Sequence, residues 1–322
     1  MVFPARFQAD DKDIGPFMIL GILPTVSNDP AVYREFFRLM ERQTLKPDLL
    51  AVGYQGEEVD CEYLKERLFP GDWSVETVFF RIGEKSLARA KNILIGEYGS
   101  DYDYIFIYED DVVYEPDYNE RMLRELENNG ADMISAVPKI PLNIKTFLRA
   151  CAFSLTHIYP FSDCRFLMSI LPFRFTLQTR YLTGGLSMAA KEVFDHVRYD
   201  DRLLLYSPGE DMDFSYRASE QYKTLLTNKI RCLHDSRSIR KFEPIAAITA
   251  KMDMWSYFFN KNIRKKYFLP QYYLLVASIV AEALMLSLRY GSGDILKAAL
   301  KTAALNRKGI YTSPFIEGYR PL

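Results

Sequence analysis

Three adjacent carboxylates, Glu109, Asp110 and Asp111, directly follow the apolar run at residues 104–108. A short continuous run rich in aromatic and β-branched residues is typical of a strand buried on both faces. Acids at its carboxyl end would lie where open α/β sheets bind their ligands. Adjacent carboxylates repel one another unless a cation neutralises them, and oxygen ligands suit Mg²⁺ or Mn²⁺. The segment therefore predicts a divalent-cation site, and the alternative is a solvated acidic turn.

Two further chemical signals occur later in the chain. Glu210 and Asp211 open a predicted helix after a glycine-containing turn, where the helix dipole favours acids. A carboxylate at such a position can act as general base for a hydroxyl group. His234 follows a later predicted strand, and a histidine distant in sequence can join a carboxylate at one metal ion. The P-loop and G-x-G-x-x-G patterns are absent, as is any Ser-His-Asp or Cys-His arrangement.

Composition narrows the class of protein. The chain has 322 residues, 48% of them hydrophobic, which suffices for one large α/β domain with an appendage or for two domains. Its formal net charge of −1 argues against a nucleic-acid binder. Four cysteines without C-x-x-C spacing predict neither a zinc site nor a disulfide framework. The polar, acidic N-terminal stretch does not resemble a signal peptide, so we expect a cytoplasmic protein.

Strand-like and helix-like segments alternate along the first half of the chain. We expect strands at residues 17–23, 49–52, 75–80, 104–108 and 133–137. We expect helices that start near Asn28-Asp29-Pro30 and that span residues 61–68, 87–98 and 122–129. This alternation predicts a parallel sheet with helices on both faces.

The second half is less regular. Residues 138–180 lack a clear period, and an irregular stretch of that length usually covers a site. Residues 181–188 predict a strand with Gly184 and Gly185 at its centre, where another group would approach the backbone closely. Further helices are expected at residues 191–197 and from residue 207, and short strands at 224–227 and 229–233.

The C-terminal region differs in character. Residues 252–267 combine aromatic side chains with a basic run, and residues 268–288 contain a single formal charge, Glu282. Their length approaches that of a membrane span, although Pro270 and Gln271 are unfavourable in lipid. Three arrangements stay open: a span, a helix lying at the membrane surface, or a helix hairpin packed on the domain. Basic residues beside an apolar helix suit an anionic membrane, so we expect peripheral membrane contact through these C-terminal helices.

Taken together, the motifs resemble those of the family 2 glycosyltransferases of the GT-A fold, from about residue 17 to about residue 238. The strongest likeness is residues 183–194 followed by 208–217, which are similar to the acceptor-site glycine segment and the Glu-Asp base motif of that family. Residues 109–111 are similar to its D-x-D metal motif, with Glu in the first place. Residues 90–92 resemble its small-Arg-Asn step, with Lys in place of Arg.

The resemblance implies a mixed, mainly parallel sheet of the GT-A type, with the catalytic domain at residues 1–240. Residues 138–180 would form an acceptor wall or lid, and residues 241–322 a helical, membrane-associating appendage. The implied activity is inverting transfer of a sugar from a nucleoside-diphosphate donor. The acceptor group would be a hydroxyl, and the reaction would depend on Mn²⁺ or Mg²⁺. The apolar and basic C-terminal region further suggests that the acceptor is a glycan or lipid-linked glycan at the inner face of the cell membrane.

The resemblance also implies roles for individual residues. The metal ligands would be Asp111, His234 and Glu109. Donor contacts would come from Pro24, Thr25, Tyr54, Lys91, Asn92, Asp110 and Arg217. The acceptor would approach Gly184 and Gly185, and the base would be Asp211, with Glu210 or Asp213 as the alternative.

Some assignments stay open. Arg217 could instead form a salt bridge to Asp213 or Glu210 on its own helix. The family's base-reading Asp after the second strand is missing here, where residues 53–57 read Gly-Tyr-Gln-Gly-Glu, so the donor nucleotide is not assigned. Two other functions compete: a polyprenyl-phosphate sugar synthase, whose acceptor is a lipid phosphate, and a non-catalytic metal-binding module docked at a membrane.

Overall fold

The centre of the molecule is an eight-stranded mixed sheet in the order β3-β2-β1-β4-β8-β6-β9-β7. The computed structural model describes residues 17–25, 30–55, 73–153, 163–205, 208–230, 232–234, 243–264 and 269–317. The strands are β1 (Ile19–Thr25), β2 (Leu49–Tyr54), β3 (Glu76–Arg81), β4 (Tyr104–Tyr108), β6 (Met133–Ala136), β7 (Thr176–Gln178), β8 (Leu186–Ala190) and β9 (Thr224–Thr227). Strands β3, β2, β1 and β4 run parallel to one another, while β8 runs antiparallel to both β4 and β6. The predicted mixed, mainly parallel sheet is confirmed.

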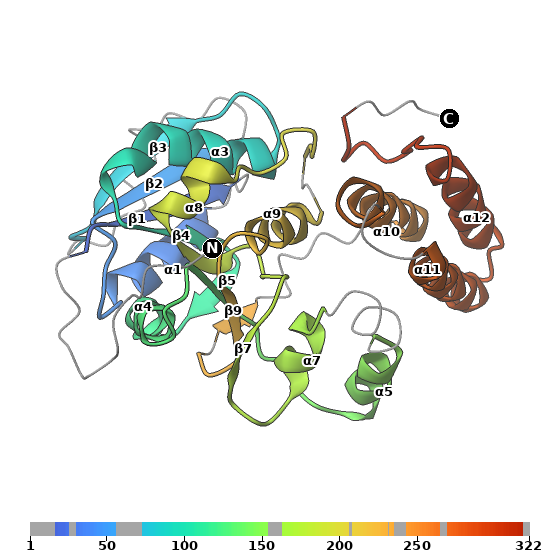
Figure 1. Cartoon of the computed structure of the whole chain (residues 1–322), viewed down its shortest axis with the longest axis horizontal. Helices are drawn as coiled ribbons and strands as arrows, with labels where there is room; N and C mark the ends of the chain where they lie inside the picture. The colour runs from blue at the N-terminus through green and yellow to red at the C-terminus, as the bar shows by residue number, and fades with distance from the viewer. Residues whose placement is uncertain are drawn as a thin grey trace.

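Helices cover both faces of this sheet (Figure 1). Helices α1 (Pro30–Glu41) and α4 (Tyr118–Asn128) pack on one face, and α3 (Leu87–Tyr98), α8 (Lys191–His196) and α9 (Glu210–Ala218) contribute to the core on the other. Successive residues of β1 enter opposite cores, because side chains alternate along a strand. All residues of β1 and β4 are buried, as expected for the two central parallel strands.

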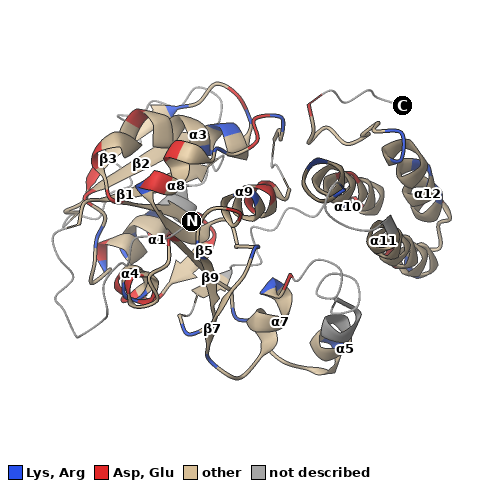
Figure 2. Cartoon of the chain, in the orientation of Figure 1, with Lys and Arg blue, Asp and Glu red and all other residues tan. Residues whose placement is uncertain are grey.

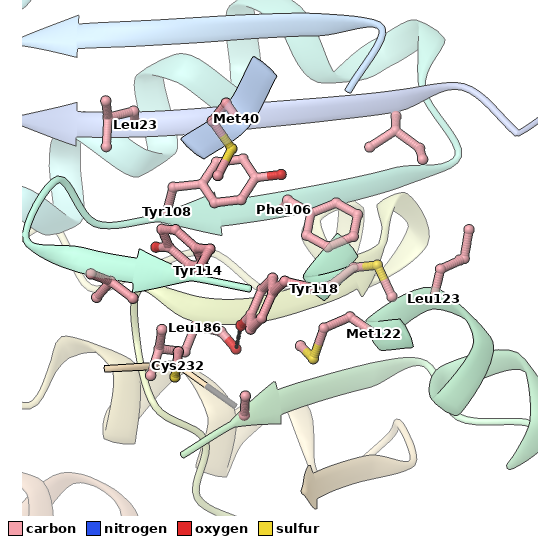
Figure 3. Close-up of a cluster of buried hydrophobic side chains, with 14 of the residues drawn as sticks. Leu23, Met40, Phe106, Tyr108, Tyr114, Tyr118, Met122, Leu123, Leu186 and Cys232 are labelled. Carbon is pink, nitrogen blue, oxygen red and sulfur yellow. Dashed lines mark hydrogen bonds between the residues drawn. The ribbon is translucent and has the colours of Figure 1, made fainter. Parts of the chain in front are cut away.

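Three buried tyrosines join the sheet to the α1–α4 face (Figure 3). The ring of Tyr114 lies 5.5 Å from that of Tyr108 and 4.9 Å from that of Tyr118, both in edge-to-face geometry. Each hydroxyl has a hydrogen-bond partner, as buried polar groups require. The hydroxyl of Tyr114 accepts from the Glu109 amide at 2.9 Å and donates to the Gly185 carbonyl at 3.0 Å. These bonds fix the acidic turn after β4 against the glycine pair before β8.

The C-terminal residues form a helical bundle with its own apolar core. It comprises α10 (Pro244–Phe258), a π-helical turn (Phe259–Ile263), α11 (Leu269–Tyr290) and α12 (Asp294–Asn306). Helix α11 buries Leu275, Ile279 and Ala283, at four-residue spacing, against the other two helices. Its opposite face exposes apolar side chains, among them Met285 and Leu288. Within the described residues, α11 alone has the length and apolar composition of a membrane span, and here one of its faces is packed.

A network of buried charges attaches this bundle to the sheet domain. The ammonium of Lys261 lies 2.5 Å from a carboxylate oxygen of Asp200 and 2.8 Å from one of Asp213. Tyr257 donates to Asp200, and Asn262 donates to Asp213 at 2.8 Å. Residues 315–317 also return to the sheet domain, where their backbone bonds residues 202–204. The bundle is therefore anchored by hydrogen bonds as well as by apolar contacts.

The hydrogen bonds and ion pairs of Asp200 predict that part of the stability of the fold is lost in acid. Burial alone would raise the pKa of Asp200, but hydrogen bonds from Arg202, Lys261 and Tyr257 hold that pKa well below its ordinary value. Because the pKa of Asp200 is lower in the folded state than in the unfolded state, the ionised group stabilises the fold at pH values above the unfolded-state pKa of about 4. This stabilisation is lost progressively as the pH falls from that value toward the folded-state pKa. We expect Asp200→Asn to lower the free energy of unfolding by roughly 1–2 kcal/mol at pH 7.

The measurement is urea unfolding of both proteins between pH 7 and pH 3.5. The difference between them should narrow below about pH 4. Asp195→Asn, which changes an exposed acid on α8, is the control and should show no such difference. A difference that stays constant over this pH range would contradict the role given to Asp200.

The structure corrects three sequence-based predictions. Residues 138–180 are not irregular throughout, because they contain α5 (Ile144–Phe153), α7 (Arg165–Ile170) and β7. The glycine pair does not lie within a strand: Gly184 and Gly185 form a turn, and β8 begins after it. The late strand is β10 (Cys232–His234) and not residues 229–233, and it pairs with β5 (Val112–Tyr114) outside the main sheet. The predicted helix at residues 61–68 lies outside the described residues.

Candidate active site

The acidic segment lies at the carboxyl end of the central strand β4, in the turn that leads to β5. Asp110 accepts a hydrogen bond from the hydroxyl of Thr25, the last residue of the neighbouring strand β1. Burial raises the pKa of Asp110, the Thr25 hydroxyl opposes this effect, and the charges of Asp111 and Glu109 raise the pKa further. The accumulated negative charge is the environment that a divalent cation would neutralise.

The pairing of β10 with β5 brings the backbone of His234 to this turn. In the antiparallel register His234 lies opposite Val112, the residue that follows Asp111. Two segments 122 positions apart in the sequence thus meet beside the carboxylates, as the prediction of a shared metal site requires. Among the residues that the structure describes, no group of three or more His, Cys, Asp or Glu side chains is arranged to hold a metal ion. The ligand set Glu109, Asp111 and His234 stays a prediction.

The Gly184–Gly185 turn lies between the two acidic motifs. The Gly185 amide donates to a carboxylate oxygen of Glu109 at 3.1 Å, and a Cβ atom at Gly185 would lie 2.0 Å from the Glu109 Cγ. A Cβ at Gly184 would lie 3.2 Å from the Cβ of Asp211 and 3.4 Å from a carboxylate oxygen of Glu210. The close approach expected at these glycines is therefore present, and the approaching groups are acidic side chains of the protein itself.

Glu210 forms a buried ion pair with Lys91 of α3. The Nζ and Oε1 atoms lie 2.5 Å apart, and the side chains are only 2% and 6% exposed. The ammonium also lies 4.9 Å from the centre of the Tyr199 ring. Burial raises the pKa of Glu210 against the opposing charge of Lys91, while the carboxylate raises the pKa of Lys91 against the effect of burial. Glu210 thus neutralises the lysine that was predicted to contact the donor.

Asp211 lies beside this pair and is paired with an arginine that the sequence interpretation missed. Its Oδ2 atom lies 2.9 Å from the Nη1 of Arg165, the first residue of α7. Asp163 holds the same guanidinium through two oxygens at 3.0 Å, and the Leu182 carbonyl accepts from it at 2.9 Å. Asp211 keeps 18% of its side-chain surface exposed. The only local signal for Arg165 was a lone Asp-x-Arg sequence, which is too common to indicate a site.

Other predicted donor-binding residues serve the scaffold in this structure. The Asn92 side-chain amide donates to the Tyr199 carbonyl at 2.9 Å and to a carboxylate oxygen of Asp201 at 2.7 Å. The Asn92 side-chain oxygen accepts from the Tyr199 backbone amide at 3.0 Å. Arg217 pairs with Asp213 at 2.8 Å, the alternative considered from the sequence. Asp213 is 1% exposed and already accepts four side-chain hydrogen bonds, so it is not placed to act as a base.

The remaining predicted donor-binding residues, Tyr54 and Pro24, lie in β2 and β1. Tyr54 is 1% exposed within the apolar core, so its ring presents no surface on which a nucleobase could stack. Pro24 lies in β1 opposite Gly53, next to Thr25. The structure therefore gathers Thr25, residues 109–111, the glycine pair and residues 210–211 at one end of the sheet, and it assigns Tyr54, Asn92 and Arg217 to the packing around them.

This mixed α/β architecture, with its acids at the carboxyl ends of the strands, is of the GT-A glycosyltransferase type. It is similar to a solved mannosyltransferase from Pyrobaculum calidifontis in complex with GDP-Man and Mn²⁺, with 14% sequence identity, a TM-score of 0.56, and coverage of 90% of this chain and 75% of that one. A mycobacterial protein (13% identity, TM-score 0.48, 77% and 75% coverage) and S. aureus TarS with UDP (10%, 0.46, 94% and 98%) are more weakly similar. No protein-family model and no curated protein matches the sequence. The likeness to the mannosyltransferase shows the fold.

Proposed function

We propose that this protein is an inverting, metal-dependent glycosyltransferase that moves a sugar from a nucleoside-diphosphate donor to an acceptor hydroxyl. The observation that carries the proposal is the Gly184–Gly185 turn, because it contacts Glu109 on one side and Asp211 with Glu210 on the other. Three motifs that are far apart in sequence thus meet at the carboxyl end of the sheet, where α/β proteins bind ligands. The mannosyltransferase of similar fold was solved with a nucleotide sugar and Mn²⁺, which supports the choice of reaction.

The residues at the β4–β5 turn suit a hard divalent cation. Asp111 and His234 would hold Mn²⁺ or Mg²⁺, with Asp110 directed toward the donor and kept in place by Thr25. Such a cation, when bound, supplies positive charge that stabilises the departing nucleoside diphosphate. One carboxylate oxygen of Glu109 accepts a hydrogen bond from the Gly185 amide, which holds the turn in place. Glu109 would therefore have this structural role in addition to binding the metal.

Asp211 is the proposed general base. The acceptor oxygen attacks the anomeric carbon and forms the new glycosidic bond, the bond from that carbon to the diphosphate oxygen breaks, and the acceptor proton passes to the Asp211 carboxylate. A single displacement of this kind inverts the configuration at the anomeric carbon. Arg165 holds Asp211 through Oδ2, which orients the carboxylate beside the glycine turn.

A second candidate function is a polyprenyl-phosphate sugar synthase. A lipid phosphate as acceptor would need no base to remove a proton, and Arg165 would bind its charge after release from Asp163 and Asp211, which now balance the guanidinium. The exposed apolar face of α11 suits a membrane-bound acceptor of either kind, glycan or polyprenyl phosphate. We propose that the protein works at the cytoplasmic face of the membrane, with peripheral contact through its C-terminal helices.

The proposal is tested by calorimetric titration of the full chain with UDP, GDP, dTDP and CDP, each with and without Mn²⁺. We expect one nucleotide to bind in a metal-dependent manner. Asp111→Asn should weaken that binding at least about tenfold, because a neutral amide is a poorer ligand for a hard cation. Asp101→Asn, an exposed acid at the other end of β4, is the control.

Failure of all four nucleotides to bind in the presence of Mn²⁺ would contradict the transferase proposal. Binding of Mn²⁺ alone, without any nucleotide effect, would favour the non-catalytic metal-binding module. An unchanged affinity in Asp111→Asn, together with metal-dependent binding in the unaltered protein, would remove Asp111 from the ligand set.

A further inference from the structure

Helix α5 presents an apolar face to solvent, although it belongs to the segment that leads to the active site. Ile144, Phe147 and Leu148 are 70%, 53% and 61% exposed, and Leu142 just before the helix is 55% exposed. Positions i, i+3 and i+4 lie on the same side of a helix, so the three side chains form one face. Large apolar side chains gathered on a surface usually mark an interaction site.

The helix that carries this face is well defined at its start. The Asn143 side chain accepts hydrogen bonds from the amides of Lys145 and Thr146, both at 3.0 Å. The Thr146 hydroxyl accepts from the Asn143 amide at 2.8 Å, which completes a reciprocal cap. Helix α5 contacts α7, and the Ile140 amide donates to the Ser169 carbonyl at 2.9 Å. Helix α5 itself lies at the edge of the molecule (Figure 1).

The charged residues in the sequence segment that contains this face have one sign. Residues 133–162 contain Lys139, Lys145 and Arg149 but neither Asp nor Glu. Lys139 and Lys145 are exposed, and the sequence of α5 contains no acidic residue. Where Figure 2 colours this helix, it shows no acid. After α7, Phe173 is 72% exposed and is followed by the exposed Arg174. The overall charge of the chain is −1, so the local excess of bases is a property of this segment and not of the protein as a whole.

We propose that the exposed face of α5 is a docking surface for an anionic lipid bilayer, separate from the C-terminal helices. Its apolar side chains would enter the boundary between headgroups and acyl chains, while the lysines remain at the level of the anionic headgroups. Charge complementarity favours this occupant, because the segment carries basic residues and no acid, and an anionic bilayer attracts such a segment.

Docking of this surface has a consequence for the active site. Arg165, which contacts Asp211, is the first residue of α7, and α5 packs on α7. A bilayer bound to α5 would therefore lie close to α7, whose Arg165 contacts the proposed base Asp211. The docking itself does not depend on the proposed transfer reaction and requires neither nucleotide nor metal.

The test is flotation of the full-length protein with vesicles of phosphatidylcholine, alone or with 30% phosphatidylserine. We expect the protein to float with the anionic vesicles, and Phe147→Ser/Leu148→Ser to reduce the partition coefficient about tenfold or more. The charge variant Lys145→Glu/Lys139→Glu should reduce binding to anionic vesicles and leave the weak binding to neutral vesicles unchanged. Met18→Ser, an exposed apolar residue before β1, is the matched control.

A parallel variant, Met285→Ser/Leu288→Ser, removes apolar side chains from α11 and measures the contribution of that helix. The proposal is overturned if the α5 variants float like the unaltered protein, if only the α11 variant loses binding, or if the unaltered protein does not float. It is also overturned if the α5 variants only dissociate an oligomer in size-exclusion chromatography. Nucleotide binding measured on the same variants separates a failure of docking from a failure of the proposed transferase function.

Discussion

Replacing Asp211 with asparagine should lower the rate of sugar transfer by about 10²–10⁴-fold, the usual contribution of a general base. Asparagine preserves the size of the side chain and can still accept a hydrogen bond from Arg165, so the local structure should be retained. It cannot take up the acceptor proton at neutral pH. The affinity for the nucleoside diphosphate should stay unchanged, because the carboxylate acts on the acceptor side.

The measurement combines initial rates of transfer with calorimetric titration of the nucleotide. Glu220→Gln, an exposed acid just beyond the end of α9, controls for a general effect of removing charge near this helix. If Asp211→Asn transfers sugar at an unaltered rate, Asp211 is not the base, and the lipid-phosphate acceptor becomes the better proposal. If it instead loses nucleotide affinity, the role of Asp211 lies in donor binding.

Replacing Lys91 with methionine should lower the free energy of unfolding by roughly 3–5 kcal/mol. The pair with Glu210 is almost completely buried, so removal of the ammonium leaves a carboxylate without its partner in an apolar environment. The remaining carboxyl group would then titrate at a higher pH than in the unaltered protein, because burial already raises the pKa of Glu210. Protonation removes the penalty, so the loss of stability should be largest at high pH and should shrink as the pH falls.

Chemical denaturation between pH 8 and pH 5 measures this effect. The double variant Lys91→Met/Glu210→Gln should recover part of the stability, since it leaves no unpaired charge and glutamine retains the acceptor for the Asp211 amide. Lys85→Met, at an exposed position before α3, is the control. A single variant as stable as the unaltered protein would show that Lys91 contributes nothing to stability and would return it to the proposed donor contact.

The sequence predicted best the features that depend on local pattern. The run at residues 104–108 is the buried central strand, and helix α3 spans the predicted residues 87–98. Both predictions succeed because a continuous apolar run and a helical period are visible in residues that are close in the sequence. Helix α5 was missed because its signal is a short Asn-x-x-Thr cap and its apolar face does not enter the core. A helix whose apolar side chains face the solvent lacks the polar-outward pattern from which helices are predicted.

The site was predicted in outline but not in its contacts. The acids after β4, the glycine pair and the Glu-Asp step meet as expected. Lys91 and Glu210 lie 119 positions apart, and nothing near either residue indicates that they neutralise each other. Arg165 lies 46 positions from Asp211 in a segment without periodicity. Such pairings arise from the way the elements pack, and a single sequence does not record them.

The ion pairs of Lys261 bear on whether the sheet domain and the C-terminal bundle fold as separate units. Asp200 and Asp213 belong to the sheet domain, where they pair with Arg202 and Arg217. Lys261, which pairs with both carboxylates, and Asn262, which donates to Asp213, belong to the helical bundle. A polypeptide that stopped near residue 240 would leave both carboxylates without these partners and would expose the surface that α10 covers. The composition changes at that point, but these ion pairs cross it. We therefore expect the helix that carries Asp211 and the C-terminal bundle to unfold together.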